Sequence, residues 1–416
     1  MSSTLRRIGI APLVGLFVSL ASGGERTYTF YDMGFFGCPS DPYTEATDVN
    51  DIGVVTGLSV VNGCNEGHAF TWFNGVKTDL DDAWRGGNFV SAEAIGRTGV
   101  IMGAGQIPNY VLDLRDGVVT VHDPPAGCEA NGYPKGMNDG GTIIVGQCDT
   151  NGSGIDAPAV YWIEDGTALA LDLFDDLPAD ATGEARDVND DGVVVGVVDG
   201  EHRSFIWQDD VMTEIFNGLG GEGVVADAIN NRGLIVGGAG TPDGDFPATS
   251  YDTNTGVMTV LGPGSAFDVN DRGSAVGRNI VDGSSSHVVL YENGETIDLH
   301  EIIIGEHLTT AHPTAINNYG WIVGWGDDNQ FRTHGWLLVP EYDKGDYDGD
   351  GDVDLQDSGH FQRCFAAEPY PNGTLHVGCS VFDFDDDVDL DLDDYAAFQA
   401  AFTGPTAPNL NPNGPG

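Results

Sequence analysis

The sequence has few basic residues, no long apolar run outside its N-terminus and no familiar catalytic motif. Only 16 of its 416 residues are Lys or Arg, against 65 Asp and Glu, which gives a formal net charge of -49. Such a surface repels phosphate backbones and anionic lipid, and it attracts divalent cations. Nucleophile elbows, phosphate loops and dinucleotide fingerprints are absent from the sequence. We therefore expect no nucleic-acid partner, and no motif indicates an enzyme class.

The N-terminal residues are typical of a secretory signal peptide. Arg6 and Arg7 precede an apolar run at residues 8–20, and small residues such as Ala21 follow it. An uncleaved membrane anchor needs roughly 18 or more apolar residues, and this run is shorter. We predict a signal peptide at residues 1–23, no transmembrane anchor and an extracellular or cell-surface location.

A twelve-residue motif recurs through most of the chain. It begins at seven positions, namely Ala46, Ala92, Lys135, Ala185, Ala226, Ala266 and Pro313. An Asn opens the central turn of every copy except the second, where Gly96 takes its place. The spacing, near 44 residues, indicates a repeat architecture, and the 61 glycines and 20 prolines suit an all-β protein with many tight turns.

Each repeat contains signals for four short antiparallel strands. In the first copy, residues 46–50 and 54–61 flank an Asn-Asp-Ile-Gly turn, and Asn74-Gly75 joins two further β runs. The seventh copy ends at Pro340 without a fourth strand, whereas residues 28–34 resemble a fourth strand that precedes the first copy. A ring closed by this N-terminal strand would leave no exposed sheet edge at the join. We predict a seven-bladed β-propeller at residues 24–340, with a linear solenoid as the alternative.

Six cysteines allow fifteen pairings. The four cysteines of the predicted propeller fall in two pairs on one face, the other two lie between the acidic C-terminal segments, and a secreted chain favours disulfides. We predict three bonds, Cys38–Cys64, Cys128–Cys148 and Cys364–Cys379.

The first repeat resembles a bacterial extracellular repeat family with a His-Ala-Phe signature. The signature occurs at His68, Ala69 and Phe70 and is followed by Trp72. The resemblance covers most of residues 28–340. That family is defined by its repeats and not by an activity, so the resemblance implies a fold and no reaction.

After Pro340 the composition changes: residues 341–402 hold fifteen Asp and two Glu, against one Lys and one Arg. Acidic residues occupy positions 1, 3, 5, 7, 9 and 12 of a calcium loop, with Gly351 at position 6. They are Asp346, Asp348, Asp350, Asp352, Asp354 and Asp357. The spacing predicts a Ca²⁺ site in which position 7 contributes its backbone carbonyl.

A second loop repeats this spacing. Its residues at positions 1, 3, 5, 7, 9 and 12 are Asp383, Asp385, Asp387, Asp389, Asp391 and Asp394. Val388 stands at position 6, where the sharp turn favours Gly and a β-branched residue is strained. We therefore expect a second Ca²⁺ site that is weaker than the first.

Each loop leads into a predicted helix with an apolar face, which includes Phe361 and Phe398. Two such loop-and-helix units resemble a type I dockerin module over residues 345–402. The resemblance implies Ca²⁺ binding and docking to a cohesin-type surface or scaffold protein. The family commonly has small hydroxyl residues at loop positions 10 and 11, whereas this chain has Leu355 and Gln356, then Leu392 and Asp393. Calcium binding is thus better supported than cohesin docking, and residues 403–416 are predicted to be a disordered tail.

Aromatic and basic residues on the predicted long-loop face suit carbohydrate stacking, although ordinary packing within the loops is the favoured interpretation. They are Trp84, Arg85, Phe89, Trp325, Phe331 and Arg332. The first hypothesis is a secreted, non-catalytic propeller that binds a protein or polysaccharide and attaches through the dockerin-like module. A glycan-active hydrolase is the alternative, since a carboxylate pair among 65 acids would suffice; a structural surface protein is the third hypothesis.

Overall fold

The structure is a computed structural model that describes residues 16–18, 26–36, 42–61, 67–80, 89–105, 111–128, 132–149, 156–162, 165–174, 176–177, 181–198, 203–281, 285–304, 308–366 and 375–403. Most of the predicted signal peptide and the tail from residue 404 lie outside these residues. The chain divides into two compact units. The first includes Tyr31–Asn317 and Ile322–Leu337, and the second includes Gly15–Phe30, Asn318–Trp321 and Leu338–Gly416.

The described residues form seven antiparallel sheets, here called blades one to seven in chain order. The strands of blades one to three are β3 (Thr44–Val49), β4 (Val55–Val60), β5 (Gly67–Phe73), β6 (Val76–Asp79), β7 (Phe89–Ile95), β8 (Ile101–Gly105), β9 (Val111–Arg115), β10 (Val118–His122), β11 (Gly132–Met137), β12 (Ile143–Asp149), β13 (Asp156–Trp162) and β14 (Thr167–Ala170). Those of blades four to six are β15 (Gly183–Val188), β16 (Val194–Val198), β17 (Arg203–Gln208), β18 (Val211–Ile215), β19 (Val224–Ile229), β20 (Leu234–Ala239), β21 (Ala248–Asp252), β22 (Val257–Gly262), β23 (Ser265–Val269), β24 (Ala275–Val281), β25 (Ser285–Glu292) and β26 (Glu295–Asp298). A short helix, α1 (His300–Ile304), leads to blade seven, whose strands are β27 (His312–Ile316), β28 (Ile322–Asp327), β29 (Thr333–Glu341), β2 (Thr27–Asp32) and β1 (Leu16–Val18).

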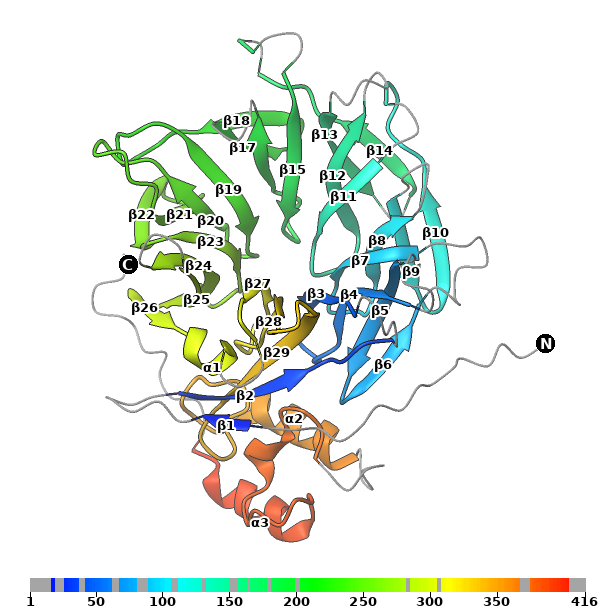
Figure 1. Ribbon diagram of the computed structural model, residues 1–416, viewed down its shortest axis with the longest axis vertical. Coiled ribbons are helices and arrows are strands. Elements are labelled where there is room, and N and C mark those ends of the chain that lie inside the picture. The colour runs from blue at the N-terminus through cyan, green and yellow to red at the C-terminus, as the bar shows by residue number, and fades with distance from the viewer. Residues whose placement is uncertain are drawn as a thin grey trace, which may run out of the picture. The chain divides into compact units, whose positions relative to one another are not determined.

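The blades follow one another around a ring (Figure 1). The first strands of neighbouring blades are in contact, and β27 and β28 of blade seven contact β3 of blade one. Apolar clusters fill the spaces between neighbours, as where Val188 and Phe205 of blade four pack with Val145 of blade three. The ring confirms the predicted seven-bladed propeller, and it excludes the linear solenoid.

The N-terminal strand closes the ring as the sequence predicted. β2 lies next to β29 in the order β1-β2-β29-β28-β27, and the Met33 amide donates to the Gly335 carbonyl at 3.0 Å. Blade seven also has a strand that the sequence did not predict, because β1 pairs antiparallel with β2 from within the predicted signal peptide. Cleavage near residue 23 would remove β1 and leave β2 at the edge of the sheet.

The recurring Asn builds both its own turn and the link to the next blade. The Oδ1 of Asn189 accepts hydrogen bonds from the amides of Asp191 (3.2 Å) and Val193 (3.0 Å). Its Nδ2 donates to the carbonyl of Asn230 in blade five at 3.1 Å. Bonds of the latter kind recur around the ring from Asn50, Asn230, Asn270 and Asn317, the last reaching the Asn50 carbonyl at 3.0 Å. A buried amide with all its partners rigidifies a packed interior, which explains why the motif repeats.

The motif also ends in Gly for a steric reason. Each first strand is bulged, as between Ala185 and Asp187 in blade four. The bulge brings the Glu184 carbonyl oxygen to 2.1 Å from where a Cβ on Gly196 would lie. Only a residue without a side chain fits there.

The second unit contains the helical C-terminal segment. Its helices are α2 (Leu355–Ala366), a 3₁₀ turn η2 (Cys379–Phe382) and α3 (Leu392–Ala401). The rings of Phe361 and Phe398 stack with centroids 4.8 Å apart, and Phe382 packs edge-on against both. The two predicted apolar helix faces therefore meet. Among the described residues, no helix is long and apolar enough to span a bilayer.

Candidate metal centre

The first acidic loop, residues 346–357, brings its carboxylates together. Asp346, Asp348 and Asp357 each offer an oxygen within 4.8 Å of the others, and so do Asp352, Asp354 and Asp357. Asp357 therefore belongs to both groups, as expected for the position-12 residue that contributes two oxygens to a calcium loop. Carboxylates at this density repel one another unless a cation lies between them, so these groups can hold a metal ion.

Backbone amides hold the position-12 carboxylate in place. The Oδ1 of Asp357 accepts from the Tyr347 amide at 2.7 Å, and its Oδ2 accepts from the Asp354 amide at 2.8 Å. Both oxygens are thus fixed by the loop that they close. Such outer contacts orient a ligand before the metal arrives.

The second loop, residues 383–394, repeats this arrangement. Asp383, Asp385 and Asp394 form one cluster, and Asp389, Asp391 and Asp394 form another. Asp394 accepts from the Phe384 amide at 2.7 Å and from the Asp391 amide at 2.9 Å, which matches Asp357 contact for contact. The sequence repeat is therefore also a repeat in space.

The remaining predicted ligands, Asp350 and Asp387, occupy position 5 of each loop. The Oδ1 of Asp350 accepts from the Asp352 amide at 3.1 Å, and the Oδ1 of Asp387 accepts from the Asp389 amide at 3.1 Å. These two carboxylates again have the same role in both loops.

Three features distinguish the second loop from the first. Val388 has a φ of 70° at the position where Gly351 has 91°, so the predicted strain is present. Asp385 is exposed, whereas its counterpart Asp348 is buried. The ammonium of Lys344 donates to the Asp386 carboxylate at 2.8 Å and places a fixed positive charge beside the second loop. We therefore still expect weaker cation binding at the second loop.

The electrostatics of the loops favour a bound cation. Burial, and then the neighbouring Asp357 and Asp348 carboxylates, raise the pKa of Asp346 to about 6. Burial also raises the pKa of Asp357, and the pKa of Asp385 is raised as well, by loss of solvation and by three neighbouring carboxylates. A group that resists ionisation for these reasons gains most from a positive charge.

The disulfides agree with the sequence prediction where the structure describes them. Cys128 pairs with Cys148, and Cys364 pairs with Cys379, each with Cα atoms 5.7 Å apart. The second bond joins α2 to η2 between the two acidic loops. Cys38 and Cys64 lie outside the described residues.

The predicted ligand residues of the propeller do not share one environment. Trp325 stacks on His312 with ring centroids 4.1 Å apart. Arg332 is paired with the buried Asp328, its Nε donating at 2.6 Å, and Phe331 is 90% exposed. Trp84, Arg85 and the side chain of Phe89 lie outside the described residues.

Sequence reasoning missed an acidic cluster of Glu45 from β3, Glu93 from β7 and Asp327 from the end of β28. Tyr43 donates its phenolic hydrogen to Glu45. Burial, together with the Glu93 and Asp327 carboxylates, raises the pKa of Glu45 although Tyr43 opposes the shift. These residues come from blades one, two and seven. Glu45 and Glu93 lie just before and within their copies of the repeated motif, whereas Asp327 lies three residues after its copy, so the sequence offers no common signal.

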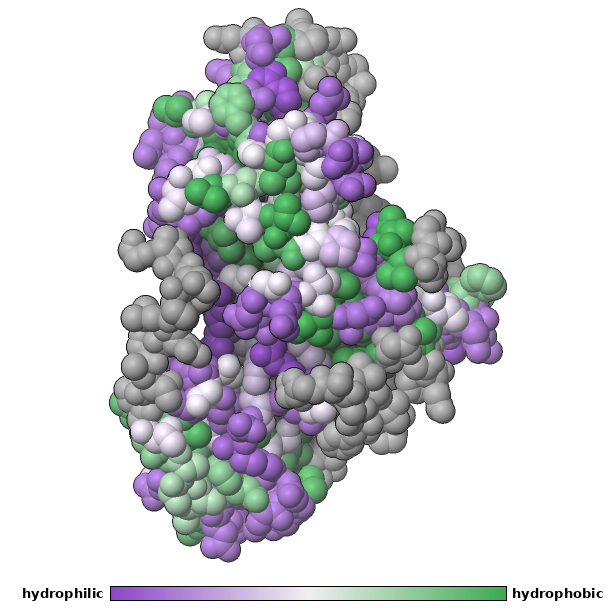
Figure 2. Space-filling model, turned by 90° about the vertical axis from the view of Figure 1, so that its left-hand side faces the viewer, coloured by the Kyte–Doolittle hydropathy of each residue, from purple (hydrophilic) through white to green (hydrophobic). Residues whose placement is uncertain are grey.

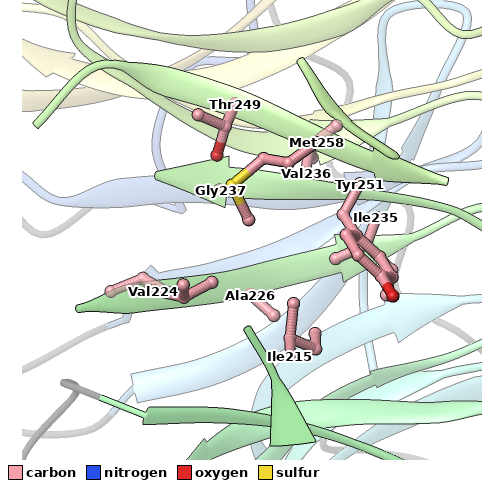
Figure 3. A pocket seen from close by; sticks show the side chains of 10 residues that line it. Ile215, Val224, Ala226, Ile235, Val236, Gly237, Thr249, Tyr251 and Met258 are labelled. Atoms are coloured by element: carbon pink, nitrogen blue, oxygen red, sulfur yellow. The ribbon is translucent and has the colours of Figure 1, made fainter. Parts of the chain in front are cut away.

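A small pocket lies within and beside blade five (Figure 3). Its lining is apolar apart from Thr249 and Tyr251, and Ile215 enters it from β18 of blade four. Charged side chains are absent from this lining. The pocket is part of the packing between two blades and offers no reactive group.

Figure 2 shows hydrophilic residues spread over the visible face, with hydrophobic residues between them.

No protein family and no curated protein matches the sequence. Among solved structures, the chain is similar to an oligogalacturonate lyase in complex with manganese, with 13% identity over 82% of this chain and 99% of that one and a TM-score of 0.52. It is also similar to an oligogalacturonate lyase from Vibrio parahaemolyticus, with 11% identity, 81% and 98% coverage and a TM-score of 0.52. The β-propeller domain of a protease from Pyrococcus furiosus has 12% identity, 73% and 97% coverage and a TM-score of 0.48. Similarity at this level of identity shows the fold alone.

Proposed function

We propose that the protein is a secreted, calcium-binding propeller that binds an extracellular protein or polysaccharide and is held in place by its C-terminal module. The observation that carries the proposal is the repeated geometry of residues 346–357 and 383–394, where a position-12 carboxylate belongs to two carboxylate groups in each loop. Two such loops bind two ions.

The chemistry of the ligands favours Ca²⁺. All the candidate ligands are oxygens, and carboxylates from positions 1, 3, 5 and 12 together with a backbone carbonyl at position 7 supply the six to eight that Ca²⁺ takes. Mg²⁺ demands near-ideal octahedral geometry and retains several waters. A flexible twelve-residue loop suits the larger ion.

The role in attachment follows from the resemblance of the two loops to a dockerin module, with a cohesin-type protein as partner. Leu355 and Leu392, at position 10 of each loop, are 79% and 72% exposed. An apolar pair in place of hydroxyl residues calls for a partner with an apolar contact surface. The predicted signal peptide and the two disulfides support an extracellular location.

Calcium titration of the full chain, followed by calorimetry after removal of metal, tests the proposal. We expect two bound ions, a tighter one at the first loop and a weaker one at the second. The variant Asp394→Asn should lose only the weaker site. A metal-free chain that binds no calcium, or binds Mg²⁺ equally well, would rule the proposal out.

Glycan hydrolysis is a second candidate function. It is favoured by the raised pKa of Glu45, because a general acid needs a pKa above the usual range of a carboxyl group. Glu93 or Asp327 would then serve as the second carboxylate. Hydrolysis assays on a panel of polysaccharides test this candidate: turnover should disappear in Glu45→Gln, and turnover that survives the change would exclude Glu45 as the acid.

A further inference from the structure

Arg278 differs from the arginines of this acidic chain that are paired with carboxylates. Arg186 pairs with Glu184 and Asp227, and Arg203 pairs with Glu214 and Asp176. Within the described residues, Arg278 forms no ion pair with a carboxylate. Its Nη1 instead donates to the Nδ1 of His312 at 3.1 Å, so most of its donors remain available.

The contact with Arg278 fixes the tautomer of His312. Because Nδ1 accepts a hydrogen bond from a guanidinium, the ring proton lies on Nε2. Burial and the adjacent Arg278 lower the pKa of His312, although Asp327 opposes the shift, so the ring is neutral near pH 7. Arg278 and His312 thus present N–H donors side by side, and neither presents a free acceptor.

An aromatic surface adjoins these donors. Trp325 pairs with His312 across strands β27 and β28 and stacks on its ring at an angle of 23°. Phe267 lies under the Arg278 guanidinium, 5.9 Å from the ring centroid. All four side chains are half-buried. They come from blades six and seven, at the strand ends opposite the Asn turns.

This arrangement selects a particular ligand chemistry. A planar guanidinium matches a carboxylate through two parallel hydrogen bonds. An indole ring binds the apolar face of a sugar. The nearby carboxylate of Asp327 accepts from the Thr333 hydroxyl at 2.8 Å, and within the described residues it forms no ion pair with Arg278.

We propose that Arg278, His312 and Trp325 bind a carboxylate-bearing sugar ring, that is, a uronic acid residue of an acidic polysaccharide. This inference rests on the ligand-binding role proposed above and adds its site and its ligand class. The net charge of -49 does not prevent such binding, because salt screens charges beyond about 8 Å at physiological ionic strength. Of the nearby acids, Asp327 already accepts a hydrogen bond from Thr333, and direct contacts with Arg278 then outweigh the screened, more distant acids.

The test compares two oligosaccharides that differ only in charge. Calorimetry on the calcium-loaded full chain would use β-1,4-linked glucuronic acid tetramers and cellotetraose, which has CH₂OH in place of each carboxylate. A sulfated cellotetraose distinguishes a carboxylate from any other anion. We expect the wild type to bind the uronate tetramer at least about tenfold more tightly than the other two.

Variants locate the site. Arg278→Gln should weaken uronate binding about tenfold or more, and Arg278→Lys should restore only part of it because an ammonium lacks the planar fork. Arg232→Gln, which removes the same charge from an exposed turn of blade five, serves as the matched control and should bind like the wild type. If Arg278→Gln does not fold, Arg278→Lys and Trp325→Ala carry the test.

Several outcomes would overturn the inference. Unchanged uronate binding in a folded Arg278→Gln protein would place the site elsewhere. Equal binding of the sulfated tetramer would mean a general anion site. Wild-type binding of cellotetraose, or of a protein ligand, without uronate binding would remove the inference and leave the proposed function standing. Failure to bind any glycan or protein would overturn both this inference and the proposed ligand-binding role. Calcium binding, measured on the same preparation, tests the metal sites independently.

Discussion

Asp187, Asn189, Asp191 and Gly192 in blade four have the spacing of half a calcium loop, and residues 346–357 form a whole one. In the blade, the oxygens of Asp187 accept from the amides of Val188 and of Ile229 in the next blade, each at 2.8 Å. Asn189 caps its own turn. The acidic loops also use backbone amides, but their carboxylates converge.

Convergence is therefore what separates the two regions. The groups of three or more potential ligands found among the described residues all lie between residues 346 and 394. The turn side chains point along the ring from one blade to the next, so each satisfies a neighbour. Residue types alone indicate hydrogen-bond acceptors or metal ligands. The direction in which the backbone points these side chains decides whether they link two blades or form a metal site.

The largest effect that separates the two regions is expected at position 12 of the first loop. Asp357→Asn keeps the amide contacts on one oxygen but removes the charge shared by both carboxylate groups. Calcium affinity of the first site should fall about 100-fold or more. Asp191→Asn, in the turn of blade four, should leave both sites unchanged. Calorimetry on the two variants measures this contrast, and equal losses would contradict it.

Loss of one of the Asn side chains that link neighbouring blades should lower the stability of the propeller. Asn317→Ala removes the bond to the Asn50 carbonyl and leaves buried polar groups unpaired, at a cost of about 1–3 kcal/mol. Urea unfolding at saturating calcium measures the change. Asn254→Ala, an exposed turn residue that donates to the Arg232 carbonyl at 3.0 Å, is the control and should change stability by under about 0.5 kcal/mol. If Asn317→Ala lowered the free energy of unfolding less than the control did, the proposed role of the Asn links between blades would be wrong.

Exchanging the residues at position 6 should make the calcium affinities of the two loops more alike. Val388→Gly removes a β-branched side chain from a backbone at φ 70° and should relieve about 1 kcal/mol of strain. The second site should then bind calcium several-fold more tightly. Gly351→Val, the reverse change at φ 91°, should weaken the first site. Terbium luminescence or calorimetry detects both shifts, and opposite signs would show that strain at this position does not set affinity.

The smallest effect concerns the pH response of an acid in the blades. Burial raises the pKa of Asp268 to about 6. A carboxyl group with a folded pKa above its unfolded value binds more protons when folded, so its contribution to stability falls as the pH rises from about 4 to about 6. Asp268→Asn lacks this dependence. Relative to the wild type, its melting temperature should rise by about 2 °C across that window, with calcium saturating throughout; a constant difference would contradict the shift.

The repeat period predicted the blades because each repeat is one local sheet. The N-terminal strand was predictable for the same reason, since the seventh copy lacks what residues 28–34 supply. β1 was not predicted, because an apolar run before a cleavage site has the composition of both a signal peptide and a strand. The two acidic loops were predictable because all twelve carboxylates lie within two short segments.

The propeller site could not be predicted from the sequence in the same way. Arg278 and His312 belong to different repeats, and their contact depends on the packing of β24 beside β27. The predicted group that included Trp325 and Arg332 relied on loop position alone. In the structure Arg332 is neutralised by Asp328, and no spacing rule distinguishes it from Arg278.

The way in which β2 completes blade seven has a consequence for how the chain reaches its native state. The bond from Thr27 to Glu341 spans 314 residues, so β2 finds its place only after the last blade has been synthesised. Closing a loop of this length costs conformational entropy that nearby contacts do not incur. Six blades can assemble as the chain emerges, whereas the seventh must wait. We therefore expect completion of that blade to be the slowest step of folding, and its seam to open first under force or heat.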